Sequence, residues 1–129
     1  MDKVRAEFVG RGGMRKAEVT LEVADTPKTR AAGLSKRASL AEGHGMFFDR
    51  AGAYWMKDVE FPLDLTFITK SGEVLETVGM PVDREGLFHY SPSVKNASRA
   101  AHAVETPFGY MESHGIVPGD TLVVTGGAK

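Results

Sequence analysis

The sequence predicts a mainly β protein of the α+β class: a small closed or nearly closed antiparallel β-barrel with two short helices packed outside. We expect about seven or eight short strands, because strand-like segments follow one another with short turns between them. Residues 17–23 and 63–69 alternate between apolar and more polar side chains, as half-buried strands do. Closure of the sheet would hide edges that otherwise pair with other chains.

The beginning of the chain is predicted to form a hairpin and a helix. Residues 4–9 are rich in apolar side chains, residues 10–13 form a glycine-rich turn, and residues 17–23 return as the second strand. Residues 25–27 then supply a capping side chain and a proline, which suits the first position of a helix. The helix is expected to end near residue 34.

The middle of the chain is predicted to contain two short strands, a hairpin and a long loop. The short strands are residues 45–48 and 53–57. The clearest hairpin of the sequence pairs residues 63–69 with residues 73–78 across a Lys-Ser-Gly turn. Residues 81–92 hold two prolines and a glycine, so we expect a long loop with one short strand near its end.

The last part of the chain predicts a strand, a short helix and a closing strand. Residues 100–105 form the first strand, and residues 107–114 form a helix that stops at a glycine. Residues 121–124 form the last strand. Gly119 and Asp120 are interpreted as a structural turn, in which glycine adopts a positive φ and aspartate accepts amide hydrogen bonds.

Length and composition limit the class of protein. The 129 residues fit one domain, residues 1–129, that can bury roughly two thirds of its unfolded surface. Sixteen basic and seventeen acidic residues give a net charge of −1, so no nucleic-acid partner is expected. The absence of cysteine excludes thiol catalysis and cysteine-based zinc sites.

The sequence also bears on location and cofactors. The first residues lack an apolar run of signal-peptide length, and no stretch approaches the ~20 apolar residues of a membrane span. We therefore expect a soluble cytoplasmic protein, or part of an intracellularly assembled particle, with no membrane partner. None of the four histidines has metal-ligand spacing, so neither a metal nor a cofactor is expected.

Five residues form a candidate polar cluster: Arg37, Trp55, Lys57, Asp64 and Glu105. Trp55 and Lys57 share one face of a predicted strand, where they either bind an anionic or aromatic ligand or pack with Lys57 along the Trp ring. Asp64 is the best candidate for a buried carboxylate, and we expect it to pair with Arg37 or Lys57. Glu105 either joins Asp64 in acid–base or metal chemistry, or it makes one structural salt bridge or caps the second helix.

The ordered blocks of the chain resemble a bacterial and archaeal family, the domain of unknown function number 192. The resemblance covers residues 17–124, and strand 4–9 is expected in the same barrel. Ser35 stands where the family usually has methionine, and the loop before Pro92 lacks a cysteine that many relatives carry. The matching blocks are 22–27, Arg30, Gly33-Leu34, Arg37, Leu40, 45–48, 54–57, 62–64, Phe67-Ile68, 72–74, Val104-Glu105, Gly109, 114–116 and Gly119-Asp120. The resemblance implies a small barrel and no agreed activity.

Two functional hypotheses remain open at this point. The first is a non-enzymatic binding or assembly module, whose partner is another protein or a larger protein assembly. Its predicted contact is the long loop, through Leu87, Phe88 and Tyr90. The alternative is a small-ligand binder or hydrolase-like enzyme with a pocket around the candidate polar cluster. No catalytic residue is assigned, because no serine lies in a nucleophile motif.

Overall fold

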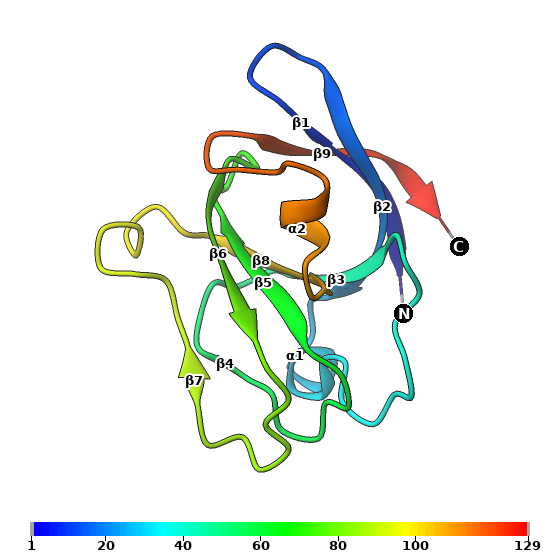
Figure 1. Ribbon diagram of the computed structural model, residues 1–129, viewed down its shortest axis with the longest axis vertical. Coiled ribbons are helices and arrows are strands. Elements are labelled where there is room, and N and C mark those ends of the chain that lie inside the picture. Colours follow the sequence, from blue (N-terminus) through cyan, green and yellow to red (C-terminus); the bar gives the residue numbers. More distant parts are fainter. Residues whose placement is uncertain (1, 129) are drawn as a thin grey trace.

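The computed structural model describes residues 2–128, and Figure 1 shows the arrangement of their nine strands and two short helices. The chain is thus mainly β, as predicted. No helix in this part of the chain is long and apolar enough to cross a membrane. The elements are β1 Lys3–Val9, β2 Arg15–Ala24, α1 Pro27–Ala32, β3 His44–Phe48, β4 Tyr54–Trp55, β5 Leu63–Ile68, β6 Val74–Met80, β7 His89–Tyr90, β8 His102–Pro107, α2 Tyr110–Ser113 and β9 Thr121–Ala128.

Seven strands form one mixed sheet in the order β6-β5-β8-β3-β2-β1-β9, and β4 pairs with β7 in a separate two-stranded sheet. Every neighbouring pair in the large sheet is antiparallel except β2 and β3, which run parallel. The expectation of a wholly antiparallel sheet is therefore wrong at this pair. A parallel neighbour needs a long crossover, and residues 25–43, which contain α1, provide it.

The large sheet curves until its two edge strands meet at one end. Glu73, just before β6, forms an isolated antiparallel bridge with Thr121 of β9. Next to this bridge, the amide of Val74 donates to the carbonyl of Asp120 at 2.7 Å, and the amide of Leu122 donates to the carbonyl of Gly72 at 2.8 Å. We call this contact the seam. Beyond it, β6 and β9 are not paired in the described residues, so no closed barrel is found.

One core cluster lies inside the curve of the sheet. It contains side chains from both edges, including Val74 and Leu122, together with Tyr110 and Met111 of α2. The Tyr110 hydroxyl also donates to the backbone carbonyl of Glu18 at 3.1 Å. The expectation that both helices pack outside is therefore wrong for α2, which lies inside the curve of the sheet (Figure 1) and contributes Tyr110 and Met111 to the inner core cluster.

A second core cluster lies on the outer face of β3, β5 and β8. It includes Met46, Phe48, Leu65 and Phe67, which alternate along their strands with residues of the opposite face. Segments between β3 and β5 and the β4–β7 pair cover this face, and α1 lies beside it (Figure 1). Because both of its faces are covered, β5 is buried along its whole length.

Helix α1 begins where the sequence predicts it. The Thr26 hydroxyl accepts a hydrogen bond from the amide of Thr29 at 3.1 Å, and Pro27 occupies the first helical position. The helix ends at Gly33, whose φ of 48° favours glycine. This end of α1 matters for the site described below, because Gly33 and Leu34 line it.

The turn before β9 uses Gly119 and Asp120. Gly119 has φ 97°, and the Asp120 carboxylate accepts hydrogen bonds from the Lys16 ammonium at 2.7 Å and the Val117 amide at 2.9 Å. Although burial opposes it, these hydrogen bonds and the charges of Lys16 and Arg11 hold the pKa of Asp120 below its usual value. The carboxylate thus ties the start of β9 to the β1–β2 hairpin.

Candidate functional site

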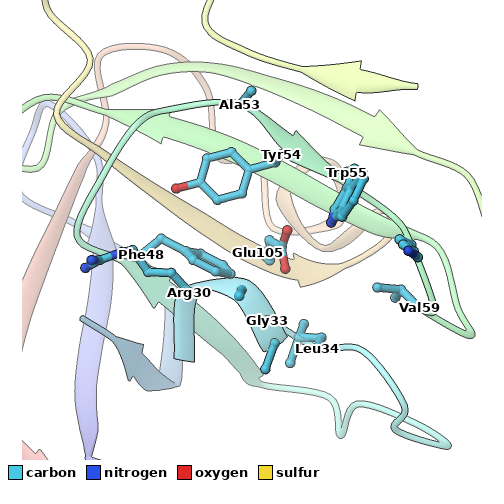
Figure 2. Close-up of a pocket in the computed structure, with 12 residues that line it drawn as sticks. Arg30, Gly33, Leu34, Phe48, Ala53, Tyr54, Trp55, Val59 and Glu105 are labelled. Atoms are coloured by element: carbon cyan, nitrogen blue, oxygen red, sulfur yellow. The ribbon is translucent and has the colours of Figure 1, made fainter. Parts of the chain in front are cut away.

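Three residues of the candidate polar cluster, Trp55, Lys57 and Glu105, lie in one pocket. The pocket has a volume of about 300 Å³ and is formed by α1, β4 and the outer face of the large sheet. Figure 2 shows the Glu105 carboxyl between Tyr54 and Trp55 on one side and Gly33 and Leu34 on the other. The complete lining is Arg30, Ala31, Ala32, Gly33, Leu34, Phe48, Ala53, Tyr54, Trp55, Lys57, Val59 and Glu105.

Arg37 lies outside the lining of this pocket. Its guanidinium donates to both carboxylate oxygens of Glu22 on β2, at 2.5 and 2.9 Å. This bidentate hydrogen bond lowers the pKa of Glu22 and raises the pKa of Arg37. Arg37 therefore holds the segment after α1 against the sheet.

Asp64 lies on the opposite face of the sheet from Glu105. In the β5–β8 register, Leu65 is opposite Glu105 and Asp64 is opposite Thr106, and successive residues of a strand point to opposite faces. Asp64 is buried and accepts a hydrogen bond from the backbone amide of Met111 at 3.1 Å. The expected pairing of Asp64 with Arg37 or Lys57, and any carboxylate pair with Glu105, is therefore wrong.

Glu105 is the buried polar group of the pocket. It is only 4% exposed, and burial alone raises the pKa of its carboxyl from 4.5 to about 8. Among residues 2–128, no protein group donates a hydrogen bond to this carboxyl or forms an ion pair with it. At pH 7 Glu105 is therefore mostly neutral, and its carboxyl can donate one hydrogen bond and accept another.

The polar groups next to Glu105 are already engaged. The Arg30 guanidinium donates to both carboxylate oxygens of Asp49, at 2.9 and 3.0 Å. The Tyr54 hydroxyl donates to the backbone carbonyl of Arg50, and burial raises the pKa of this phenol well above its usual value. Neither Arg30 nor Tyr54 compensates Glu105, so the carboxyl remains available for a ligand.

Trp55 and Lys57 form the exposed edge of the pocket. The Lys57 ammonium lies 5.3 Å from the centre of the Trp55 ring, in a cation–π arrangement. Trp55 is 46% exposed and packs edge-on against His89 of β7. Close by is Gly86 with φ 69°, where an added Cβ would lie 2.8 Å from the Cβ of Lys57 and 3.0 Å from Trp55. The segment before β7 therefore supports this edge of the pocket.

The model of the family DUF192, described as "Uncharacterized ACR", matches residues 9–124. The chain belongs to this family. The match includes every residue that lines the pocket, and it begins earlier than the resemblance read from residues 17–124.

Two solved structures are similar to this DUF192 chain. A Sinorhizobium meliloti protein described as a "putative transcription regulator" is 28% identical, with a TM-score of 0.81, and the alignment covers 95% of this chain and 93% of that one. A Novosphingobium aromaticivorans protein of unknown function is 24% identical, with a TM-score of 0.78, over 93% of this chain and 84% of that one. The second likeness concerns the fold alone. No curated protein matches the chain.

Sequence reasoning missed several residues of the DUF192 pocket. Arg30, Phe48 and Tyr54 line it but were not assigned to the candidate polar cluster. Tyr54 had a usable signal, because it adjoins Trp55 in a short strand. Arg30 belongs to the blocks that match the family, but its place in the pocket depends on the crossover that brings α1 beside β3 and β4. Among the described residues, no group of three or more acidic or histidine side chains could hold a metal ion.

The predicted contact loop of this DUF192 protein carries two exposed apolar side chains. Leu87 and Phe88 are 71% and 64% exposed, whereas Tyr90 is half-buried against the outer core cluster. The Asp83 carboxylate accepts hydrogen bonds from the amides of Leu87 at 3.2 Å and Phe88 at 3.0 Å. These bonds fix the backbone that presents Leu87 and Phe88, which we call the apolar tip.

Proposed function

We propose that this DUF192 protein binds a small organic ligand in the pocket of Glu105. The observation that carries the proposal is a buried carboxyl without a protein partner at the floor of a concave site. The carboxyl lies in a largely desolvated site, where a hydrogen bond to a ligand is stronger than the same bond at an exposed carboxyl.

The walls of the pocket support a ligand with an apolar body. Phe48, Tyr54 and Trp55 contribute aromatic surface, and Leu34 and Val59 contribute aliphatic surface. Such a mostly apolar lining with a few polar groups is typical of small-molecule sites. The Nη1 of Arg30 and the hydroxyl of Tyr54 are held in structural hydrogen bonds, so Lys57 is the group of the lining that can act together with Glu105 on a ligand.

A fragment screen by two-dimensional NMR tests this function on the full chain. Ligands of the pocket should shift the indole signal of Trp55, which is the only Trp in the sequence, together with the amide of Glu105. Glu105→Leu should abolish these shifts and leave the protein folded. Glu42→Leu, at an exposed carboxylate before β3, is the matched control and should retain them. Fragments that bind Glu105→Leu equally well would refute the assigned site.

A second candidate function, contact with another protein, is favoured by the apolar tip. Leu87 and Phe88 are adjacent and exposed, and their backbone amides are held by the Asp83 carboxylate. We infer that a protein partner with an apolar depression receives this tip. Replacing both residues by serine should abolish the interaction with that partner. Val94→Ser, at a side chain that is 97% exposed elsewhere, should leave it intact.

We also infer that the large sheet behaves as a nearly closed barrel. The support is the seam between β6 and β9 and the core cluster that takes side chains from both strands. Amide exchange tests this inference, since the amides of Val74 and Leu122 should exchange as slowly as those in the centre of the sheet. Rapid exchange of these two amides would mean that the sheet is open.

A further inference from the structure

We propose that the ligand of this pocket is a small organic acid anion, whose carboxylate accepts a hydrogen bond from Glu105 and pairs with Lys57. This inference rests on the proposed ligand-binding function and names its chemical class. It follows from the polar side chains of the lining that lack a protein partner in the described part of the chain, each of which can donate a hydrogen bond to a ligand.

Arg30 donates to Asp49 through Nη1, and three further groups of the lining can donate a hydrogen bond to a ligand. They are the neutral carboxyl of Glu105, the ammonium of Lys57 and the indole N–H of Trp55. Figure 2 shows the nitrogen edge of the Trp55 indole turned toward Glu105. Within residues 2–128, neither the indole N–H nor the ammonium donates a hydrogen bond to another protein group. Because these donors line the same pocket, they favour a ligand that accepts hydrogen bonds.

The other charged side chains around Glu105 form ion pairs with one another. The ammonium of Lys57, which forms no ion pair in the described residues, therefore makes the net charge around the carboxyl positive. Glu22 is held by Arg37, and Asp49 is held by Arg30. The remaining titratable group near the carboxyl, Tyr54, donates to a backbone carbonyl. The titratable and charged groups around Glu105 come from several elements. They are Arg30 from α1, Asp49 after β3, Tyr54 from β4, Lys57 after β4, and the ion pair of Glu22 from β2 with Arg37.

A cationic ligand fits these charges poorly. It would need Glu105 to ionise in a site where burial disfavours the charged carboxylate. It would also lie close to Lys57, which has no carboxylate partner in the described chain. An anion instead meets a carboxyl that already carries its proton, and this proton completes a charge-assisted hydrogen bond between the two acids.

The volume of the pocket sets the size of the ligand. A volume of about 300 Å³ lies at the lower end of the ~300–1,000 Å³ range of small-ligand pockets. This space suits a small molecule, such as a carboxylate on one aromatic or aliphatic ring. The aromatic walls from Phe48 and Tyr54 would then contact the ring.

Benzoate, benzamide and benzamidinium provide a test, because they share one shape and differ in charge and hydrogen-bond donors. Their binding to the full chain is measured by the fluorescence of Trp55. Benzoate should bind about tenfold or more tightly than benzamide, and benzamidinium should bind most weakly. If benzamidinium binds most tightly, or if benzoate does not bind at millimolar concentration, the acid inference is wrong. In that case, fragments that shift the NMR signals of Trp55 and Glu105 would still support the ligand-binding function. That function is refuted only if no fragment shifts these signals.

The dependence of binding on pH tests the role of Glu105. If the bound form of Glu105 carries its proton, the dissociation constant of benzoate should be constant between pH 6 and 7. It should rise up to about tenfold per pH unit above the pKa of about 8. Glu105→Gln keeps a hydrogen-bond donor that does not titrate, so its affinity should stay constant across the same range. A wild-type affinity that rises with pH would contradict the proposal.

The role of Lys57 is tested with a variant that keeps its apolar stem. Lys57→Met should weaken benzoate about tenfold and leave benzamide within about twofold. Lys28→Met removes an exposed ammonium from α1 outside the pocket and should change neither affinity. Equal losses of benzoate and benzamide in Lys57→Met would mean that Lys57 only packs on Trp55, and the pairing would be rejected.

Discussion

Glu105 differs from the other buried acids of the described chain. Asp64 accepts a hydrogen bond from the Met111 amide, and Asp120 accepts from Lys16 and Val117. Glu105 has no such compensation, although an apolar side chain of the same size would pack there at lower cost. A protein keeps a destabilising polar group of this kind most often at a functional site.

The ionisation of Glu105 should make stability depend on pH. Its carboxyl has a pKa of about 8 in the folded protein and 4.5 as its ordinary value, so between these limits the folded state holds the extra proton. The free energy of unfolding should therefore fall as pH rises from 4.5 to 8, by up to about 1.4 kcal/mol per unit, and level off above 8. Urea unfolding at several pH values measures this slope.

Glu105→Gln provides the reference for that slope. Glutamine has nearly the same shape and does not titrate, so the difference between the two unfolding curves isolates the single carboxyl. The wild type should lose stability relative to the variant between pH 5 and 8. Parallel curves over this range would show that Glu105 ionises as an exposed carboxylate does.

At the residue scale, the sequence predicted the members of the site better than their positions. Trp55, Lys57 and Glu105 were assigned to one polar cluster, and the structure places them in one pocket. Asp64 was assigned to the same cluster but lies on the opposite face of the sheet. The error arose because spacing along the chain does not determine which face a residue of a fully buried strand occupies. That face depends on the register between β5 and β8, which pairs residues about forty positions apart.

At the scale of elements, local patterns succeeded where local contacts decide the structure. The alternation over residues 17–23 and the turn before residue 73 correspond to β2 and to the β5–β6 hairpin. The parallel β2–β3 pair and the buried α2 were not predicted. Both depend on how distant segments share one interior, and α2 is a short helix whose two buried residues give little periodic signal.

The segment before β7 should control the edge of the pocket. Gly86→Ala places a Cβ at 2.8 Å from Lys57 and 3.0 Å from Trp55, at a φ of 69° that disfavours alanine. We expect a loss of about 1–3 kcal/mol in stability and a changed fluorescence spectrum of Trp55. Gly43→Ala is the matched control, because Gly43 also has a positive φ but no atom within 4 Å.

The Gly43 control separates backbone strain from loss of packing. It should lose up to about 1 kcal/mol in stability and leave the fluorescence of Trp55 unchanged. Equal effects of the two substitutions would show that the segment before β7 does not support Trp55. The pocket would then depend on β4 and α1 alone.

At the scale of the whole molecule, the seam allows one large sheet to take part in two core clusters. The inner cluster is enclosed because β6 and β9 meet at the seam. The outer cluster is covered by segments between β3 and β8 that do not belong to the large sheet. The pocket belongs to this outer layer. Its floor comes from β8, an inner strand of the large sheet that carries Glu105, and its edge comes from the short segment that carries Trp55 and Lys57.

Gly72 is the residue on which the seam depends most. It has φ 99°, and an added Cβ would overlap the backbone carbonyl of Leu122. Gly72→Ala should therefore break the hydrogen bonds of Val74 and Leu122 across the seam and lower the free energy of unfolding by about 2–4 kcal/mol. Gly13→Ala, at a positive φ with no atom within 4 Å, should lose about 1 kcal/mol at most.

Amide exchange should speed up at Val74 and Leu122 in the Gly72 variant alone, while the Glu105 pocket on the outer face keeps its ligand affinity. If the binding free energy of the ligand falls as much as the free energy of unfolding, the inner and outer core clusters form one cooperative unit. The floor of the pocket would then depend on the seam.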